Sequence, residues 1–169
     1  GYAGIAHWAD SLQCRMGYVW VDREGRRVYK IDSGLEELSA NGMRDYFRDD
    51  FCQIAGSDDR VTDWNGGGGY AIGYDPQFDR LLFTGIKFGG DSTTRTIDGE
   101  TISYSARNGA WASMHDHRPQ MYFQSYSNLY FLNEYNMRTI TVAGGNQTMM
   151  YKLNNANQGV CAPYLIAGQ

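Results

Sequence analysis

The stretch of sequence that decides the fold class is Tyr70–Ile86, YAIGYDPQFDRLLFTGI. It contains two runs rich in aromatic and branched residues, Tyr70–Tyr74 and Arg80–Ile86. The five residues between them, Asp75–Asp79, include Pro and two Asp, which favour a turn. Two such runs joined by a short turn are typical of an antiparallel β-hairpin. This stretch therefore predicts a fold built from strands.

The same pattern recurs on both sides of this hairpin. Gly17–Lys30 is predicted to form a hairpin of its own. Thr101–Ser105 and Ala110–His115 are predicted to form another, because the Asn108-Gly109 pair between them is a strong turn signal. Four further strands are predicted toward the C-terminus, at Met121–Tyr126, Asn128–Leu132, Thr139–Val142 and Thr148–Leu153.

One short helix is predicted, over about Asn41–Asp50. Asn41 is a residue type that caps helix N-termini, and it precedes a run with helical spacing of apolar residues. The helix is expected to lie across the end of a sheet. Its apolar face would be formed by Met43, Tyr46, Phe47 and Phe51.

The composition of the 169 residues is that of a globular protein, with 42% hydrophobic and 20% charged residues. The net charge of −4 argues against general binding to the phosphates of nucleic acids. No apolar run approaches about 18 residues, so no membrane span is predicted. The Gly-rich loop at residues 65–69 is not followed by Lys-Ser or Lys-Thr, so no nucleotide is expected there.

A weak repeat suggests how the strands are arranged. Three segments share the form apolar-Tyr-x-apolar-polar: Arg27–Asp32, Asn128–Asn133 and Met149–Asn154. Four-stranded sheets repeated and packed face to face form a β-propeller. We therefore predict an all-β fold of propeller-like, stacked antiparallel sheets, with a β-sandwich as the alternative. Residues 1–169 are expected to form a single β domain, either on its own or as a fragment of a larger propeller.

His115 and His117 are the best candidates for metal ligands, because alternate residues of a strand lie on the same face. Zinc, however, takes three or four protein ligands, and His7 and the three cysteines are distant in the sequence. We predict no metal site and no cofactor.

Paired carboxylates occur at Asp58-Asp59, at Asp75 with Asp79, and at Glu36-Glu37. Glycoside hydrolysis needs two carboxyl groups that face each other across a cleft, about 5–10 Å apart. Neighbours in sequence rarely take that arrangement, and Asp75 is better explained as a turn residue. Neither Cys52 nor Cys161 has the local signature of a nucleophile. We predict no catalytic residues and no enzyme; a hydrolase that uses Asp75 and Asp79 is the alternative.

Aromatic residues are in surplus, with 13 Tyr and 4 Trp. Tyr and Trp are enriched at protein interfaces, so the surplus favours assembly through protein–protein contacts. The same side chains stack on sugar rings, which leaves a carbohydrate-binding surface as an alternative, and they also fill cores. Arg23, Arg26 and Arg27 are interleaved with acidic residues and are expected to form a solvated edge or a subunit contact.

Four motifs in a fixed order carry a resemblance to a known family. They are Tyr18–Lys30, Asn41–Asp49, Gly73–Asp79 and Thr101–His115, followed by a strand at Tyr151–Asn154. In this order the chain resembles the large tail structural proteins, of the muzzle or tail-hub kind, that lie near the portal in crAss-like and related short-tailed bacteriophages.

This resemblance implies a propeller-like β domain without catalytic residues, in the tail of a virion. The partners it implies are other tail and portal proteins and copies of the chain itself, with a host surface glycan as the alternative. The protein would be made in the cytoplasm of the host and located in the virion.

Overall fold

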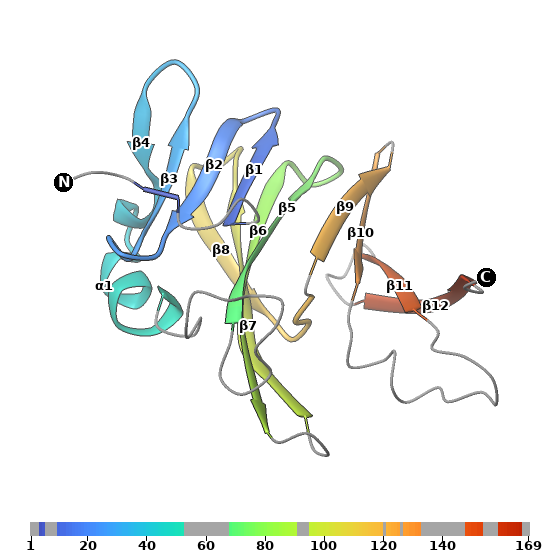
Figure 1. Ribbon diagram of the computed structural model, residues 1–169. Helices are drawn as coiled ribbons and strands as arrows, with labels where there is room; N and C mark the ends of the chain where they lie inside the picture. The colour runs from blue at the N-terminus through green and yellow to red at the C-terminus, as the bar shows by residue number, and fades with distance from the viewer. Residues whose placement is uncertain are drawn as a thin grey trace.

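The computed structural model describes residues 4–5, 10–52, 68–90, 95–119, 121–125, 127–132, 148–153 and 159–166. In this part of the chain, twelve strands form three four-stranded antiparallel sheets. Each strand pairs with its neighbours in chain order, so each sheet is a simple meander. The fold is therefore all-β, as the sequence predicts (Figure 1).

The strands of the first sheet are β1 (Ser11–Cys14), β2 (Gly17–Asp22), β3 (Arg27–Ile31) and β4 (Leu35–Glu37). Those of the second sheet are β5 (Gly68–Asp75), β6 (Arg80–Gly90), β7 (Arg95–Ser105) and β8 (Ala110–His115). Those of the third sheet are β9 (Met121–Ser125), β10 (Asn128–Leu132), β11 (Thr148–Leu153) and β12 (Gly159–Ile166).

A short helical segment follows the first sheet, where the sequence predicts one. It consists of a 3₁₀ turn η2 (Leu38–Ala40), a single α-helical turn α1 (Arg44–Tyr46) and a π-helical turn η3 (Phe47–Phe51). Within it, Phe47 and Phe51 are fully buried. None of the helices in the described ranges has the length and hydrophobicity needed to cross a lipid bilayer.

The predicted role of Asn41 as helix cap is wrong. Met43 occupies the N-cap position of α1, and its side chain makes no capping hydrogen bond. The backbone N–H of Asn41 donates to the Leu38 carbonyl and thereby closes the preceding 3₁₀ turn. Its side-chain amide donates to the Tyr104 hydroxyl on the second sheet, at 3.3 Å. Asn41 therefore ends one turn and ties it to a sheet, and it does not begin the next helix.

The three sheets are stacked in chain order, with the second sheet between the other two (Figure 1). One side of the second sheet meets the first sheet and the helical segment in the main core. Its other side meets the third sheet in a smaller apolar cluster. Strand β5 packs against β1 on one side and against β9 and β10 on the other.

At the junction between the first and second sheets, the two sheets contribute different kinds of side chain. The first sheet contributes aliphatic side chains, of which Val19, Val21 and Val28 are fully buried. The aromatic rings on strands come from the second sheet: Tyr70, Tyr74, Phe83, Tyr104 and Trp111.

The junction between the second and third sheets follows the same division. The ring of Tyr122, on the third sheet, lies against Gly73 of the second, where a Cβ would come within 2.6 Å of the Tyr122 Cγ. Leu82 of the second sheet packs with Leu129 and Phe131 of the third. In both junctions the aromatic rings on strands belong to the later sheet.

Most predicted strands are confirmed within a few residues, but some features differ. Gly68 and Gly69 are predicted to belong to the loop, yet they begin β5 and pair with Lys87 and Ile86 of β6. The backbone pairing along this long hairpin outweighs the low strand propensity of glycine. Strands β1, β4 and β12 are not predicted at all. Strand β7 begins at Arg95, six residues before the predicted start at Thr101. The predicted strand Thr139–Val142 lies outside the described residues.

Candidate functional site

The outward side of the first sheet carries a row of aromatic rings. Because side chains alternate along a strand, Tyr18, Trp20 and Tyr29 point away from the core that holds Val19 and Val28. The Trp20 ring lies 5.6 Å from the Tyr29 ring and 5.9 Å from the Tyr18 ring, centroid to centroid. The Trp20 ring is buried, and its indole N–H has no hydrogen-bond partner in the described part of the chain.

The same side of the sheet ends in two exposed aliphatic residues. Ile31 and Leu35 are paired across β3 and β4, and they are 45% and 60% exposed. Together with the three rings they form what we call the first-sheet face, defined by Tyr18, Trp20, Tyr29, Ile31 and Leu35.

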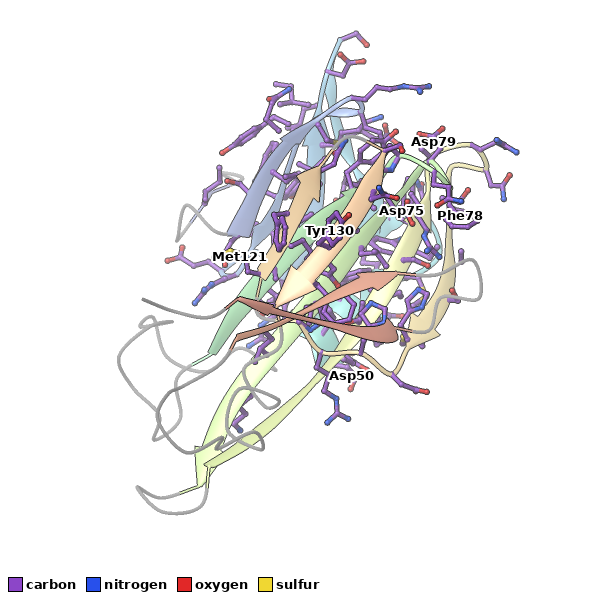
Figure 2. The ribbon with its side chains drawn as sticks, turned by 90° about the vertical axis from the view of Figure 1, so that its right-hand side faces the viewer. Asp50, Asp75, Phe78, Asp79, Met121 and Tyr130 are labelled. Atoms are coloured by element: carbon purple, nitrogen blue, oxygen red, sulfur yellow. The ribbon has the colours of Figure 1, made fainter. Side chains whose placement is uncertain are left out.

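The opposite end of the stack carries a second such surface. On the third sheet, Tyr122 and Phe131 point toward the second sheet, so Met121, Phe123 and Tyr130 point away from it. The Phe123 and Tyr130 rings stack at 5.4 Å with an interplanar angle of 11°, and Met121 is 50% exposed. Met121, Phe123 and Tyr130 define the third-sheet face, which is turned to the viewer in Figure 2.

These two faces have the chemistry of binding surfaces. The free energy falls when another apolar surface covers exposed Leu, Ile and Met side chains and the partly buried rings beside them, because apolar area is removed from water. Neither face combines a nucleophile with a base, as covalent catalysis would require. The arrangement is therefore suited to packing against another protein.

The carboxylates of Asp75 and Asp79 lie at the β5–β6 hairpin end, but each has an internal partner (Figure 2). The Arg80 guanidinium donates to Asp75 at 2.9 Å, and the side chains of this ion pair are only 9% and 5% exposed. Asp75 also accepts the Gln77 backbone N–H, as its predicted turn role requires. Asp79 accepts the Tyr74 hydroxyl at 2.7 Å.

Asp75 and Tyr74 are neighbours on β5, so their side chains lie on opposite faces of the sheet. Asp75 and its partner Arg80 therefore lie on the face of the second sheet that meets the third sheet. Asp79 is bound by Tyr74, whose side chain lies on the face that meets the first sheet. This geometry does not set the two carboxylates across a common cleft.

The carboxylates of Glu36 and Glu37 also have partners of their own. Glu36 forms an ion pair with Lys30 at 2.9 Å. Glu37 accepts hydrogen bonds from Arg27 and Arg44. Asp58 and Asp59 lie outside the described residues.

His115 and His117 are brought together, as the sequence predicts, with ring centroids 5.1 Å apart. His117 stacks on Phe131 at 5.3 Å, and its Nε2 is buried without a hydrogen-bond partner among the described residues. Burial, aided by the nearby His115 and Arg80, lowers the pKa of His117 to about 3. No third ligand joins the pair in the part of the chain that the structure describes.

A buried polar network that the sequence does not reveal lies beside this histidine pair. The Thr84 hydroxyl is 2.8 Å from that of Thr101 and 2.7 Å from that of Tyr122. Thr101 in turn donates to the His117 carbonyl at 2.6 Å. The network ties the second sheet to the third and to the segment that connects them.

The predicted arginine cluster is divided among separate partners. The Arg23 guanidinium makes two hydrogen bonds to the buried carboxylate of Asp10, at 2.6 and 3.1 Å. Asp10 also accepts the Tyr70 backbone N–H, so this ion pair joins the first and second sheets. Arg26 donates to the Arg48 carbonyl, and Arg27 pairs with Glu37. Asp10 is not among the residues predicted from the sequence, because a lone aspartate has no motif that marks it.

Cys52, which has no nucleophile signature in the sequence, is a buried free thiol. Burial raises its pKa to about 12, with a further contribution from Asp22. A thiol with so high a pKa is a poor nucleophile at neutral pH. Cys161 lies on β12. Trp111, part of the aromatic surplus, packs into the core and donates its indole N–H to the Leu38 carbonyl at 3.0 Å.

Comparison with known proteins adds no family to this description. The chain matches no family model and no curated protein sequence.

Proposed function

We propose that this chain is a structural protein of a virion, a component of a phage tail assembly that acts through protein–protein contacts. The observation that supports this proposal is the pair of apolar faces at the two ends of the stack. Inside the molecule, faces of this kind are covered by a neighbouring sheet. At the ends, Leu35 and Met121 remain 60% and 50% exposed.

The arrangement of the sheets also supports a propeller-like assembly. Each sheet is a four-stranded meander, as in a propeller blade, and the first strands β1, β5 and β9 pack in series. In a propeller the first strands of successive blades likewise lie side by side around the axis. Further sheets, from copies of the chain or from other tail and portal proteins, would extend the series toward a ring.

The mass of the native assembly in solution tests this proposal. We expect light scattering after size-exclusion chromatography to give a mass of several chains of 19.1 kDa each, which falls on dilution. A particle of one chain mass at every concentration, with no partner captured from tail or portal proteins, would contradict the proposal.

The carbohydrate-binding alternative has a smaller basis. Phe78 is an exposed aromatic side chain, with 37% of its surface accessible. It lies at the tip of the β5–β6 hairpin, with the Arg80 guanidinium 4.8 Å from its ring centroid (Figure 2). Binding to a glycan array that disappears in Phe78→Ala would favour this alternative over assembly.

A further inference from the structure

The stack of sheets has a direction. At the first junction the second sheet turns rings such as Tyr70 and Phe83 toward the valines of the first sheet. At the next junction the third sheet turns Tyr122 toward Gly73 and Leu82 of the second. At both described junctions the later sheet thus turns aromatic rings toward the earlier one, and the earlier sheet meets them with aliphatic or small side chains.

The first-sheet face follows this rule but has no sheet before it among the described residues. Its rings, Tyr18, Trp20 and Tyr29, are of the kind that the second and third sheets turn toward their predecessors. The third-sheet face is the side that a following sheet would cover, and it carries the stacked rings of Phe123 and Tyr130 beside the exposed Met121. The two ends are therefore opposite sides of the stack: the first-sheet face is the side that a preceding sheet would cover, and the third-sheet face is the side that a following sheet would cover.

We propose that the first-sheet face of one copy packs against the third-sheet face of a second copy, head to tail. This inference rests on the proposed function and names its partner. Such a heterologous contact repeats the order of the internal junctions, in which the rear side of one sheet meets the front side of the next, whereas a symmetric contact of one face with itself does not. In the contact, Leu35 and Ile31 of one copy would be buried together with Met121 of the other.

Two substitutions separate the two faces. Leu35→Glu places a charge on the first-sheet face and leaves the third-sheet face intact, and Met121→Glu does the reverse. Both side chains are at least half exposed, so neither substitution buries a charge in the monomer. The matched control is Met114→Glu, because Met114 is 52% exposed but lies on β8 of the second sheet.

We expect each end-face variant to weaken self-association at least tenfold by light scattering, and Met114→Glu to assemble like the wild type. An equimolar mixture of Leu35→Glu and Met121→Glu should form a particle of two chain masses. In this mixture one intact contact remains, between the third-sheet face of the first variant and the first-sheet face of the second. Growth stops there, because both remaining ends carry a glutamate.

The outcomes separate this inference from the proposed function. If the wild type assembles but the mixture does not yield the dimer, the head-to-tail contact is overturned and assembly by another surface stands. Loss of assembly in Met114→Glu would overturn it as well, since the effect would not belong to the end faces. If the wild type is a monomer at every concentration, self-association itself fails, and capture of a tail or portal protein then decides the proposed function. Circular dichroism of each variant checks that the sheets are retained.

Discussion

Gly73 is the residue at which the second and third sheets come closest. The absence of a side chain lets the Tyr122 ring lie directly on the backbone of β5, and a Cβ would approach within 2.6–2.9 Å of three Tyr122 atoms. Gly73→Ala should therefore lower the free energy of unfolding by about 1–3 kcal/mol through overpacking. The control is Gly34→Ala, where a Cβ meets nothing within 4 Å. Equal stability of the two variants in urea denaturation would contradict this account.

His117 is expected to make stability depend on pH. The folded protein holds this imidazole neutral, with a pKa of about 3, whereas the unfolded chain takes up a proton near the ordinary value of 6.5. Acid therefore favours the unfolded state, and stability is lost as pH falls from about 6.5 toward 3. The slope of this contribution is at most about 1.4 kcal/mol per pH unit.

Urea denaturation at several pH values, in the wild type and in His117→Gln, measures this contribution. The difference between the two proteins should be constant above pH 7 and should shrink as the pH falls from 6.5 to 4, because only the wild type loses the histidine contribution. A difference that does not change with pH would show that His117 titrates normally. The burial of His115, which lowers its pKa too, affects both proteins alike.

At the scale of elements, the β5–β6 hairpin is anchored by the buried pair of Asp75 and Arg80. Arg80→Met should cost about 3–5 kcal/mol, because it leaves the Asp75 carboxylate buried without its cation. The double variant with Asp75→Asn removes both charges and should recover part of that loss. Thermal or urea denaturation compares the two, and additive losses would contradict the pairing. Arg48→Met, in an exposed ion pair, should change little.

The hairpins were predictable because their signals are local. Strand-forming runs and turn residues lie within a few positions of each other, as in Tyr70–Ile86, and the pairing in register follows from the turn. Strand β1 has only four residues, so the alternation of Leu12 and Cys14 with Ser11 and Gln13 is too short to stand out in the sequence. The cap at Asn41 was predicted wrongly because its side chain donates to Tyr104, a partner 63 residues away that the local sequence does not reveal.

The packing of the faces could not be predicted in the same way. In β6, Leu81, Leu82 and Phe83 are apolar on both sides of the strand, and all three are fully buried. Such a run predicts burial but does not say which side meets which sheet. Likewise, the ion pair of Asp10 and Arg23 and its link to Tyr70 span 13 and 60 residues of sequence, and a single sequence carries no signal for contacts of that range.

At the scale of the whole molecule, the two junctions differ in the apolar surface that they bury. The core of the first and second sheets is the larger cluster and includes the helical segment, whereas Leu82, Tyr122, Leu129 and Phe131 form a small one. We therefore expect the third sheet to open at a lower free energy than the first two. Native-state hydrogen exchange should show faster exchange for β9 and β10 than for β5 and β6. Equal protection of all four strands would contradict this order.

The serial contacts of β5, with β1 behind it and β9 ahead of it, also bear on how such a chain can change in evolution. In a layered molecule whose units interact chiefly with their nearest neighbours, stability is roughly a sum over units and junctions. Duplicating or deleting the coding segment of one unit then lengthens or shortens the array while the remaining junctions keep their form. Diversity among descendants of this architecture is thus expected to arise in whole meanders, gained or lost at once.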